Sequence, residues 1–293
     1  MAGTAWKVAA GCGIGCLIII IGAASLGVGG FLLARGAVRE VKQIADLQDE
    51  VARRFGTVED HTPRYGAIPS DRMEAFAEVR DAMAAIMERW GDHDTSFPPP
   101  RGPKGFLEGL NMIRGGVKAV STLGRLIETR NRALLDAEMG FGEYYYLYAT
   151  VYYGWLGRSP GDCLRGVSVQ TDGQGHTMSF SDGAHSGDLP GVYRTTYMGM
   201  LRRSLAQGDT VGRPRDETWR AAVQAELDAL EHDGARMPWA DGLPEMVTRS
   251  LGPFRQRLET RYWKVSNCFE LTTLETEGNF RERLLEAEEH GVV

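Results

Sequence analysis

The first apolar run of the chain is also its longest. Residues 8–34 include no charged side chain. As a helix these 27 residues would be about 40 Å long, more than the ~30 Å hydrocarbon core of a bilayer. The apolar region of a cleavable signal peptide is about half as long. We therefore predict a retained transmembrane anchor over residues 1–36.

Small residues recur along this apolar run at helical spacing. Glycines seven residues apart lie near one stripe of a helix, and glycine lets a neighbouring helix come close in lipid. Glycine is also frequent in membrane helices without such a role. We predict a helix-packing face, and packing on a second copy or on a foreign helix fits it equally well. Its members are Gly11, Gly15, Gly22, Ala23, Gly27, Gly29 and Gly36.

Beyond the anchor the apolar positions follow helical spacing. Residues 37–56 continue the pattern as a helical stalk, and residues 57–293 form a mainly helical extrinsic domain. A helix is expected from Ser70, with an apolar face of Met73, Phe76, Val79, Met83, Ile86, Met87 and Trp90. Further helices are expected over about 106–139, 192–206, from Asp216, after Pro244 with a kink at Pro253, and over 280–289.

Residues 140–157 carry aromatic side chains nearly all the way round a helix, which predicts burial on most sides. Tyr144, Tyr148 and Trp155 form one ridge by spacing, and Tyr145 belongs to an adjacent one. One interpretation is an internal core. Because tyrosine and tryptophan often act as interface anchors, we also expect at least one ridge to contact another subunit or lipid headgroups.

Residues 158–191 differ from the rest, since glycine, serine and aspartate dominate there. Two alternating stretches flank the dipeptide Asp172-Gly173, a combination typical of a β-hairpin. The predicted fold is therefore mainly α, with a single N-terminal transmembrane helix, a helical extrinsic domain and a small β-hairpin excursion.

Composition and charge narrow the function classes. The chain is 43% hydrophobic and 25% charged, as in globular proteins. Its net charge of -6 gives no electrostatic case for nucleic acid. Four cysteines are too few for a disulfide scaffold. A bridge between Cys163 and Cys268 and two unpaired thiols both remain open.

The glycine-rich segment holds the best candidate for chemistry. Imidazole and carboxylate groups gather over residues 172–188 and could bind zinc or another divalent ion: His176, Asp182, His185 and Asp188. Their spacing matches no metal-site family, and aspartate also favours turns for backbone reasons. The sequence contains no HExxH, GxSxG, P-loop or CxxCH motif. We assign no catalytic residue and no cofactor.

The orientation of the anchor is argued from its flanks. Lys7 precedes the apolar run, and several basic residues follow it, which by the positive-inside rule favours a cytoplasmic body. Short-tailed anchors, however, often keep the N-terminus inside, and a Cys163–Cys268 bridge would suit an oxidising compartment. We expect a single-pass protein of a bacterial inner membrane with a periplasmic body.

Three functions are consistent with these patterns. The first is a non-catalytic accessory or structural subunit that docks on transmembrane and extrinsic subunits of a larger complex, such as a respiratory, reaction-centre or light-harvesting complex. The second is a membrane-anchored metal-dependent hydrolase that uses the 172–188 loop. The third is an anchored envelope binding protein. We favour the first, because a small-residue seam and an aromatic segment suit docking.

Overall fold

The computed structural model describes a mainly helical body. The described residues are 43–63, 66–91, 122, 124–162, 167–172, 175–180, 189–206, 217–264, 266–267 and 270. Within these ranges no helix has the length and hydropathy needed to cross a bilayer. The predicted anchor at residues 8–34 lies outside them and stays a prediction.

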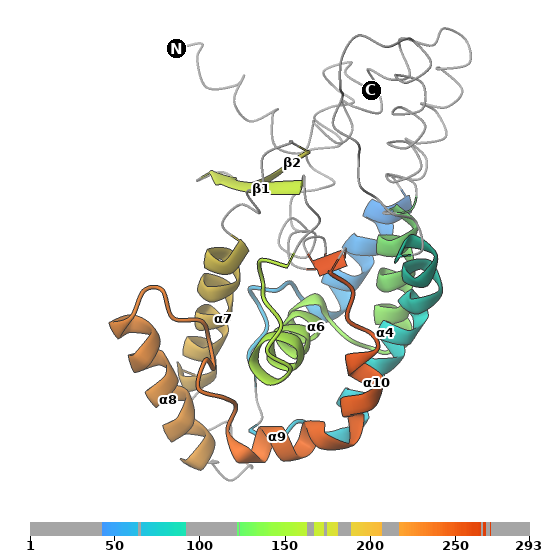
Figure 1. Cartoon of the computed structure of the whole chain (residues 1–293). Coiled ribbons are helices and arrows are strands. Elements are labelled where there is room, and N and C mark those ends of the chain that lie inside the picture. Colours follow the sequence, from blue (N-terminus) through green and yellow to red (C-terminus); the bar gives the residue numbers. More distant parts are fainter. Residues whose placement is uncertain are drawn as a thin grey trace, which may run out of the picture.

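The helices wrap around one central helical segment (Figure 1). Two helical stretches, 43–55 and 124–136, flank the N-terminal part of the body. The labelled helices are α4 (Ser70–Gly91), α6 (Phe141–Tyr148), η1 (Ala149–Trp155), α7 (Leu189–Ala206), α8 (Glu217–His232), α9 (Glu245–Leu251), η2 (Gly252–Phe254) and α10 (Arg255–Glu259). Figure 1 shows α4 and α10 on one side of α6, with α7 and α8 on the other.

Strands β1 (Val167–Asp172) and β2 (Gly175–Phe180) pair antiparallel in the segment where the sequence predicts a hairpin. The register places Asp172 opposite Gly175 and Thr171 opposite His176. These two strands form a separate two-stranded sheet. Most of the buried core residues that the structure describes come from helices.

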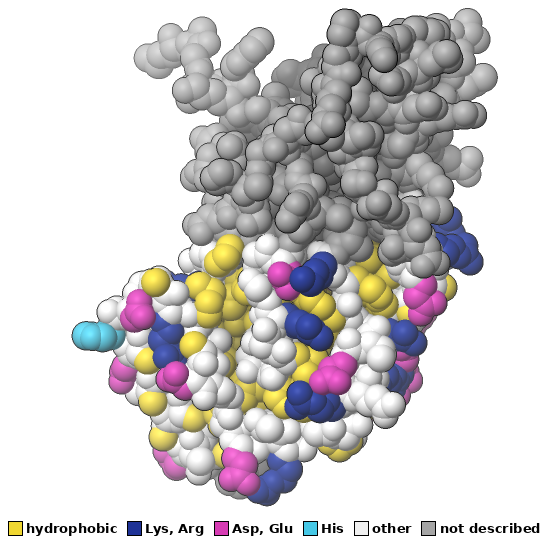
Figure 2. Space-filling view, viewed as in Figure 1, with side chains coloured by type: hydrophobic (Ala, Val, Ile, Leu, Met, Phe, Trp, Pro, Cys, Tyr) yellow, Lys and Arg dark blue, Asp and Glu magenta, His cyan; other side chains and the backbone are white. Residues whose placement is uncertain are grey.

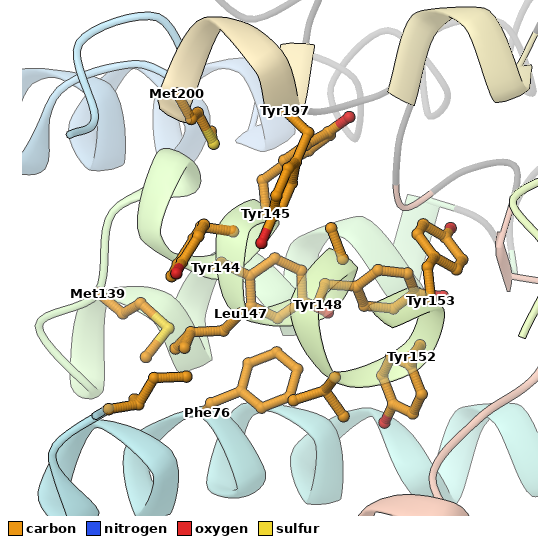
Figure 3. Close-up of a cluster of buried hydrophobic side chains, with 14 of the residues drawn as sticks. Phe76, Met139, Tyr144, Tyr145, Leu147, Tyr148, Tyr152, Tyr153, Tyr197 and Met200 are labelled. Carbon is orange, nitrogen blue, oxygen red and sulfur yellow. The ribbon is translucent and has the colours of Figure 1, made fainter. Parts of the chain in front are cut away.

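The central segment is an α-helix that widens into a π-helix, from α6 into η1. All its tyrosines are buried, which confirms the predicted burial on most sides (Figure 3). A π-turn brings in one extra residue per turn, and Leu156 N donates to the Val151 carbonyl at 2.9 Å. Tyr152 and Tyr153 are consecutive, yet both rings are buried around this wider turn.

The start of α6 lies directly against the loop after helix 43–55. A methyl group added at Gly142 would lie 2.2 Å from the His61 Cβ and 2.9 Å from the Thr57 carbonyl oxygen. Real Cβ atoms do not approach so closely, so this crossing requires glycine.

Two further predictions are confirmed by the helices around the core. The predicted apolar face of α4 is buried at Met73, Phe76 and Met83. Pro253 interrupts the helix after Pro244, because η2 is a short 3-10 turn between α9 and α10. A proline cannot donate its backbone hydrogen bond, and a tighter turn accommodates it.

The described part of the predicted stalk belongs to the body. In helix 43–55 the Val51 side chain is buried in the same core as the tyrosines, and Gln48 is buried as well. Gln43 Nε2 also donates to Glu128 Oε1 at 3.2 Å, across to helix 124–136. Residues 43–55 are thus packed against the body rather than free-standing.

Candidate functional site

A buried arginine lies on the inner face of α4. Arg80 is 0% exposed, although its neighbours along that face are apolar. Three aromatic rings surround its guanidinium: the Cζ atom is 5.1 Å from the ring centre of Tyr148, 5.3 Å from Tyr152 and 4.8 Å from Trp263. Ring faces are electron-rich and attract a cation at these distances. The end of α6, η1 and the chain beyond α10 thus build a cage for one positive charge.

A buried carboxylate neutralises this cation. Glu270, 2% exposed, accepts a short hydrogen bond from Arg80 Nη1 through Oε1. The Tyr144 hydroxyl donates to Glu270 Oε2 at 3.0 Å and accepts from Arg80 Nη1 at 2.8 Å. Arg130 Nη1, from helix 124–136, lies 3.9 Å from the same Oε2. We call these four residues, Arg80, Arg130, Tyr144 and Glu270, the ionic centre.

The chain that carries Glu270 is held at two further points. We call the described residues between Arg261 and Glu270 the closing segment. The Arg261 carbonyl accepts from Arg80 Nη2 at 2.7 Å and from the Tyr152 hydroxyl at 3.1 Å. Both bonds lie on the buried side of the segment, next to the aromatic cage.

The second point is a buried asparagine. Asn267 Oδ1 accepts from the Tyr148 hydroxyl at 2.9 Å and from the Tyr153 hydroxyl at 2.7 Å. Its Nδ2 donates to the carbonyl oxygens of Pro160 at 3.1 Å and Asp162 at 2.8 Å. One amide therefore ties the closing segment both to η1 and to the loop that follows it.

On the outer side of α4 the same segment is held by surface charges. Asp81 accepts from Arg257 Nε at 2.7 Å and from Arg261 Nε at 2.6 Å. Partial burial alone would raise the pKa of the Asp81 carboxyl, but the hydrogen bonds from Arg261 and Arg257 outweigh it and hold the pKa below its ordinary value.

The hydroxyl of the ionic centre, that of Tyr144, stays protonated. Burial raises the pKa of Tyr144 well above the ordinary tyrosine value, more than the neighbouring Arg80 lowers it. Burial alone would lower the pKa of Arg80, but Tyr144, Tyr152 and Glu270 together raise it. The Tyr144 hydroxyl is therefore a neutral donor, and Arg80 is a permanent cation. Because the charges of Arg80 and Glu270 are both enclosed, the arrangement is suited to fixing the fold rather than to receiving a substrate.

The structure places the tyrosines of both predicted ridges in the core. Tyr144, Tyr145 and Tyr148 are 0% exposed and pack inside the chain's own core, as in the internal-core interpretation (Figure 3). Figure 1 shows α4 and α10 on one side of α6 and α7 and α8 on the other, and the tyrosines of α6 share one hydrophobic core with residues of these helices. Trp155, at the end of η1, is partly buried, and the Arg255 Cζ lies 5.2 Å from its ring centre.

The other predicted site residues are placed only in part. His176 lies in β2, opposite Thr171. The described residues contain no group of three or more side chains suited to hold a metal. The remaining predictions fall on residues outside the described ranges: the metal candidates Asp182, His185 and Asp188, the cysteines Cys163 and Cys268, and the packing face at Gly11, Gly15, Gly22, Ala23, Gly27, Gly29 and Gly36.

The ionic centre is not among the sites predicted from the sequence, although the sequence contains one sign of it. Arg80 lies four residues after Phe76 and three before Met83, which is the spacing of the apolar face. A charge within such a stripe indicates a buried cation that needs a partner. No spacing rule links Arg80 to Glu270 or Asn267, which lie far along the chain.

Comparison of the chain with protein-family models, with curated proteins and with solved structures finds no match.

Proposed function

We propose that the chain is a non-catalytic, membrane-anchored accessory subunit that docks on a larger membrane assembly and stabilises it. One observation carries the proposal. Glycines recur every seven residues, at Gly15, Gly22, Gly29 and Gly36, along a run of 27 uncharged residues. Glycine weakens a helix, and its repeated use on one stripe is explained by close contact with another helix in lipid.

The surface of the body supports the assignment of docking to the anchor. Its large aromatic side chains are turned inward, and Phe55 is the one large hydrophobic side chain in the described ranges that is exposed, at 36%. Figure 2 shows one face on which acidic and basic side chains alternate with small hydrophobic areas. Stable protein interfaces are usually centred on buried aromatic anchors. We therefore assign the main partner contact to the anchor, and a weaker, polar contact to the body.

The proposed setting is a bacterial inner membrane with the body in the periplasm. The partners would be transmembrane and extrinsic subunits of an assembly such as a respiratory or photosynthetic complex. The body would act as a preformed rigid unit, because its central charges are already bound to internal partners.

The test replaces two glycines of the packing face. In Gly22→Leu/Gly29→Leu, leucine keeps the run apolar but holds a neighbouring backbone away. We expect unchanged membrane insertion and at least a tenfold loss of partner subunits that co-purify in mild detergent, measured by quantitative mass spectrometry. The matched control is Gly13→Leu/Ala24→Leu, which adds one methylene less bulk about half a turn away from the stripe of Gly22 and Gly29. If the double variant retains its partners as well as the control does, the anchor is not the docking element.

A further inference from the structure

Five tyrosine rings form a continuous row through the body, from α7 to the chain beyond α10. The ring centres of Tyr193 and Tyr153 lie 4.8 Å apart, and those of Tyr153 and Tyr148 lie 5.8 Å apart. The row continues with 4.7 Å between Tyr148 and Tyr152 and 5.2 Å between Tyr152 and Tyr262. Rings at these spacings are in direct contact, and Figure 3 shows the middle of the row. We call these five residues the tyrosine row. It links the buried core to the surface, because Tyr193 is fully buried and Tyr262 is partly exposed.

A row of touching tyrosines can pass on the loss of one electron. Tyrosine is among the few side chains that a one-electron oxidant attacks, and electron exchange between two rings slows steeply as their separation grows. A tyrosine that loses an electron also releases its hydroxyl proton, because a positive charge is costly in buried apolar surroundings. The groups that can take this proton therefore decide where an oxidising equivalent comes to rest.

The hydroxyls in the middle of the row donate to neutral oxygens. Tyr148 and Tyr153 both donate to Asn267 Oδ1, and Tyr152 donates to a backbone carbonyl. Amide oxygens do not take up protons at neutral pH. The Arg80 guanidinium also lies against the rings of Tyr148 and Tyr152, which disfavours a positive charge on either ring. The middle of the row thus does not hold an oxidising equivalent.

The outer end of the row has a carboxylate as its hydrogen-bond acceptor. The Tyr262 hydroxyl donates to Asp162 Oδ2 at 3.3 Å, and the Asp162 side chain is 29% exposed. Two cations lie nearby: the Arg158 Cζ is 5.2 Å from the ring centre of Tyr262, and Lys264 Nζ is 3.8 Å from Asp162 Oδ1. Both cations are exposed, so water and salt screen their charges. Asp162 can therefore accept the hydroxyl proton of Tyr262.

A second tyrosine, Tyr144, also donates to a carboxylate, but in different surroundings. Its acceptor, Glu270, is enclosed together with the guanidinium groups of Arg80 and Arg130. These buried cations attract the carboxylate without screening by water, which lowers its tendency to take a proton. Tyr262 is thus a better resting point for an oxidising equivalent than Tyr144.

We propose that the tyrosine row is a relay, which carries an oxidising equivalent from the buried core to Tyr262. A reductant in the surrounding water reaches this end of the row, because Tyr262 and Asp162 are both partly exposed. The relay would spare the buried aromatic side chains from lasting oxidation. It does not depend on the proposed docking function, because it concerns only contacts within one chain.

The transfer balances in electrons and protons. A one-electron oxidant removes an electron from a buried ring, and that ring takes an electron from its neighbour nearer the surface. Once Tyr262 has lost the electron, its hydroxyl proton moves along the hydrogen bond to Asp162 Oδ2. The products are a neutral tyrosyl radical and a neutral carboxyl group. A thiol in the surrounding water then gives Tyr262 a hydrogen atom and becomes a thiyl radical, and Asp162 releases its proton to water.

The first test generates the oxidising equivalents inside the full-length protein in detergent. An ultraviolet pulse ejects electrons from the tyrosine rings, a cobalt(III) ammine captures these electrons, and a nitrosoalkane spin trap marks the radicals for peptide mapping by mass spectrometry. Tyr152→Phe keeps a ring in place but interrupts the row, because phenylalanine is not oxidised by a tyrosyl radical. We expect the adduct at Tyr262 to fall about fivefold, because one ring instead of five then supplies it.

The matched control for this test is Tyr146→Phe, which removes a buried hydroxyl outside the row. We expect the Tyr262 adduct of this control to stay near the wild-type level. If the adduct in Tyr152→Phe is as large as in Tyr146→Phe, the row does not carry oxidising equivalents and the proposal is overturned.

The second test removes the proton acceptor. In Asp162→Asn the side chain can still accept a hydrogen bond from Tyr262, but it no longer takes up the proton. The readout is the tyrosyl signal in electron paramagnetic resonance of samples frozen after the pulse, counting the part that Tyr262→Phe abolishes. We expect this signal to fall about tenfold, the order by which a hydrogen bond to a charged group exceeds one to a neutral group.

The control for the second test is Lys264→Gln, which removes the ion pair with Asp162 and leaves the carboxylate in place. We expect it to keep the wild-type signal. If Asp162→Asn keeps as much signal as Lys264→Gln, Asp162 does not take the proton and the relay has no end point. Asp162 and Lys264 both reach the surface, so this test decides the proposal even if Tyr152→Phe fails to fold.

Discussion

Two neighbours on α4, Arg80 and Asp81, hold the same segment from opposite sides and in different surroundings. Arg80 faces the core and is 0% exposed, whereas the Asp81 side chain is 34% exposed. Arg261 contacts both: its carbonyl accepts from Arg80, and its guanidinium donates to Asp81. The chain after α10 is thus bound by a buried charge and by a surface charge one residue apart.

This difference shows that burial decides how much each charge contributes to the stability of the fold. The surface pairs at Asp81 are weakened by water and by salt, and such pairs typically contribute under about 1 kcal/mol. In the ionic centre no water competes, so every charge must keep its partner. The presence of a charge therefore does not tell how much a contact contributes to stability. Three substitutions measure these contributions separately.

The largest effect is expected from Glu270→Gln. The amide has nearly the same shape but no charge, so Arg80 remains buried without its counterion. We expect a loss of about 3–5 kcal/mol in the free energy of unfolding of the body, measured by urea denaturation. The matched control is Glu259→Gln, which removes an exposed pair with Arg255 and should change stability by less than about 0.5 kcal/mol. Equal losses in the two variants would mean that the centre is hydrated.

An intermediate effect is expected from Tyr144→Phe. This change deletes one hydroxyl that bonds both Arg80 and Glu270, and it leaves the ring in place. Hydrogen bonds to charged groups contribute about 1.5–3 kcal/mol, so the free energy of unfolding should fall by that amount. Tyr262→Phe, whose hydroxyl bonds the partly exposed Asp162, should cost clearly less. If Tyr144→Phe is as stable as Tyr262→Phe, the Tyr144 hydroxyl does not stabilise the ionic centre.

The smallest effect is expected from Asp81→Asn, under about 1 kcal/mol. Its contribution should shrink further at 1 M salt, where the Debye length is about 3 Å. The folded pKa of Asp81 is lower than the unfolded one. The stability that it adds is therefore complete above the ordinary value of 3.8 and is lost as the pH falls through the lowered pKa. Urea midpoints of wild type and Asp81→Asn should converge below that range. If the two urea midpoints still differ at that low pH or at 1 M salt, the Asp81 pairs do not behave as surface ion pairs.

Features of the body that depend on residues close together in the sequence could be predicted, whereas features that depend on distant residues could not. Local patterns sufficed for the apolar face of α4, for the burial of residues 140–157 and for the break at Pro253, since each follows from residues within a few turns. The π-helical turn in η1 cannot be predicted from the spacing of residues, because it depends on what packs around Tyr152 and Tyr153.

The candidate site was not predictable in the same way. Arg80 interrupts an apolar stripe and so signals that a partner exists, but many carboxylates in the chain could supply it. The pairing with Glu270 follows only from the path of α10 across α4. For the aromatic ridges the limit of sequence reasoning is a different one. Spacing shows which residues share a face, and it does not show whether that face meets the same chain or another one.

The 190 residues that separate Arg80 from Glu270 also set an order of events during synthesis. At about 5–20 residues per second, roughly 10 to 40 s pass between the translation of the two partners. In the later part of this interval α4, α6 and η1 have all been translated, yet Arg80 still lacks Glu270 as its counterion, so burying it in the core would be costly. A nascent chain interrupted before Glu270 would leave its aromatic rings open to chaperones and proteases, which gives the cell a way to recognise unfinished copies.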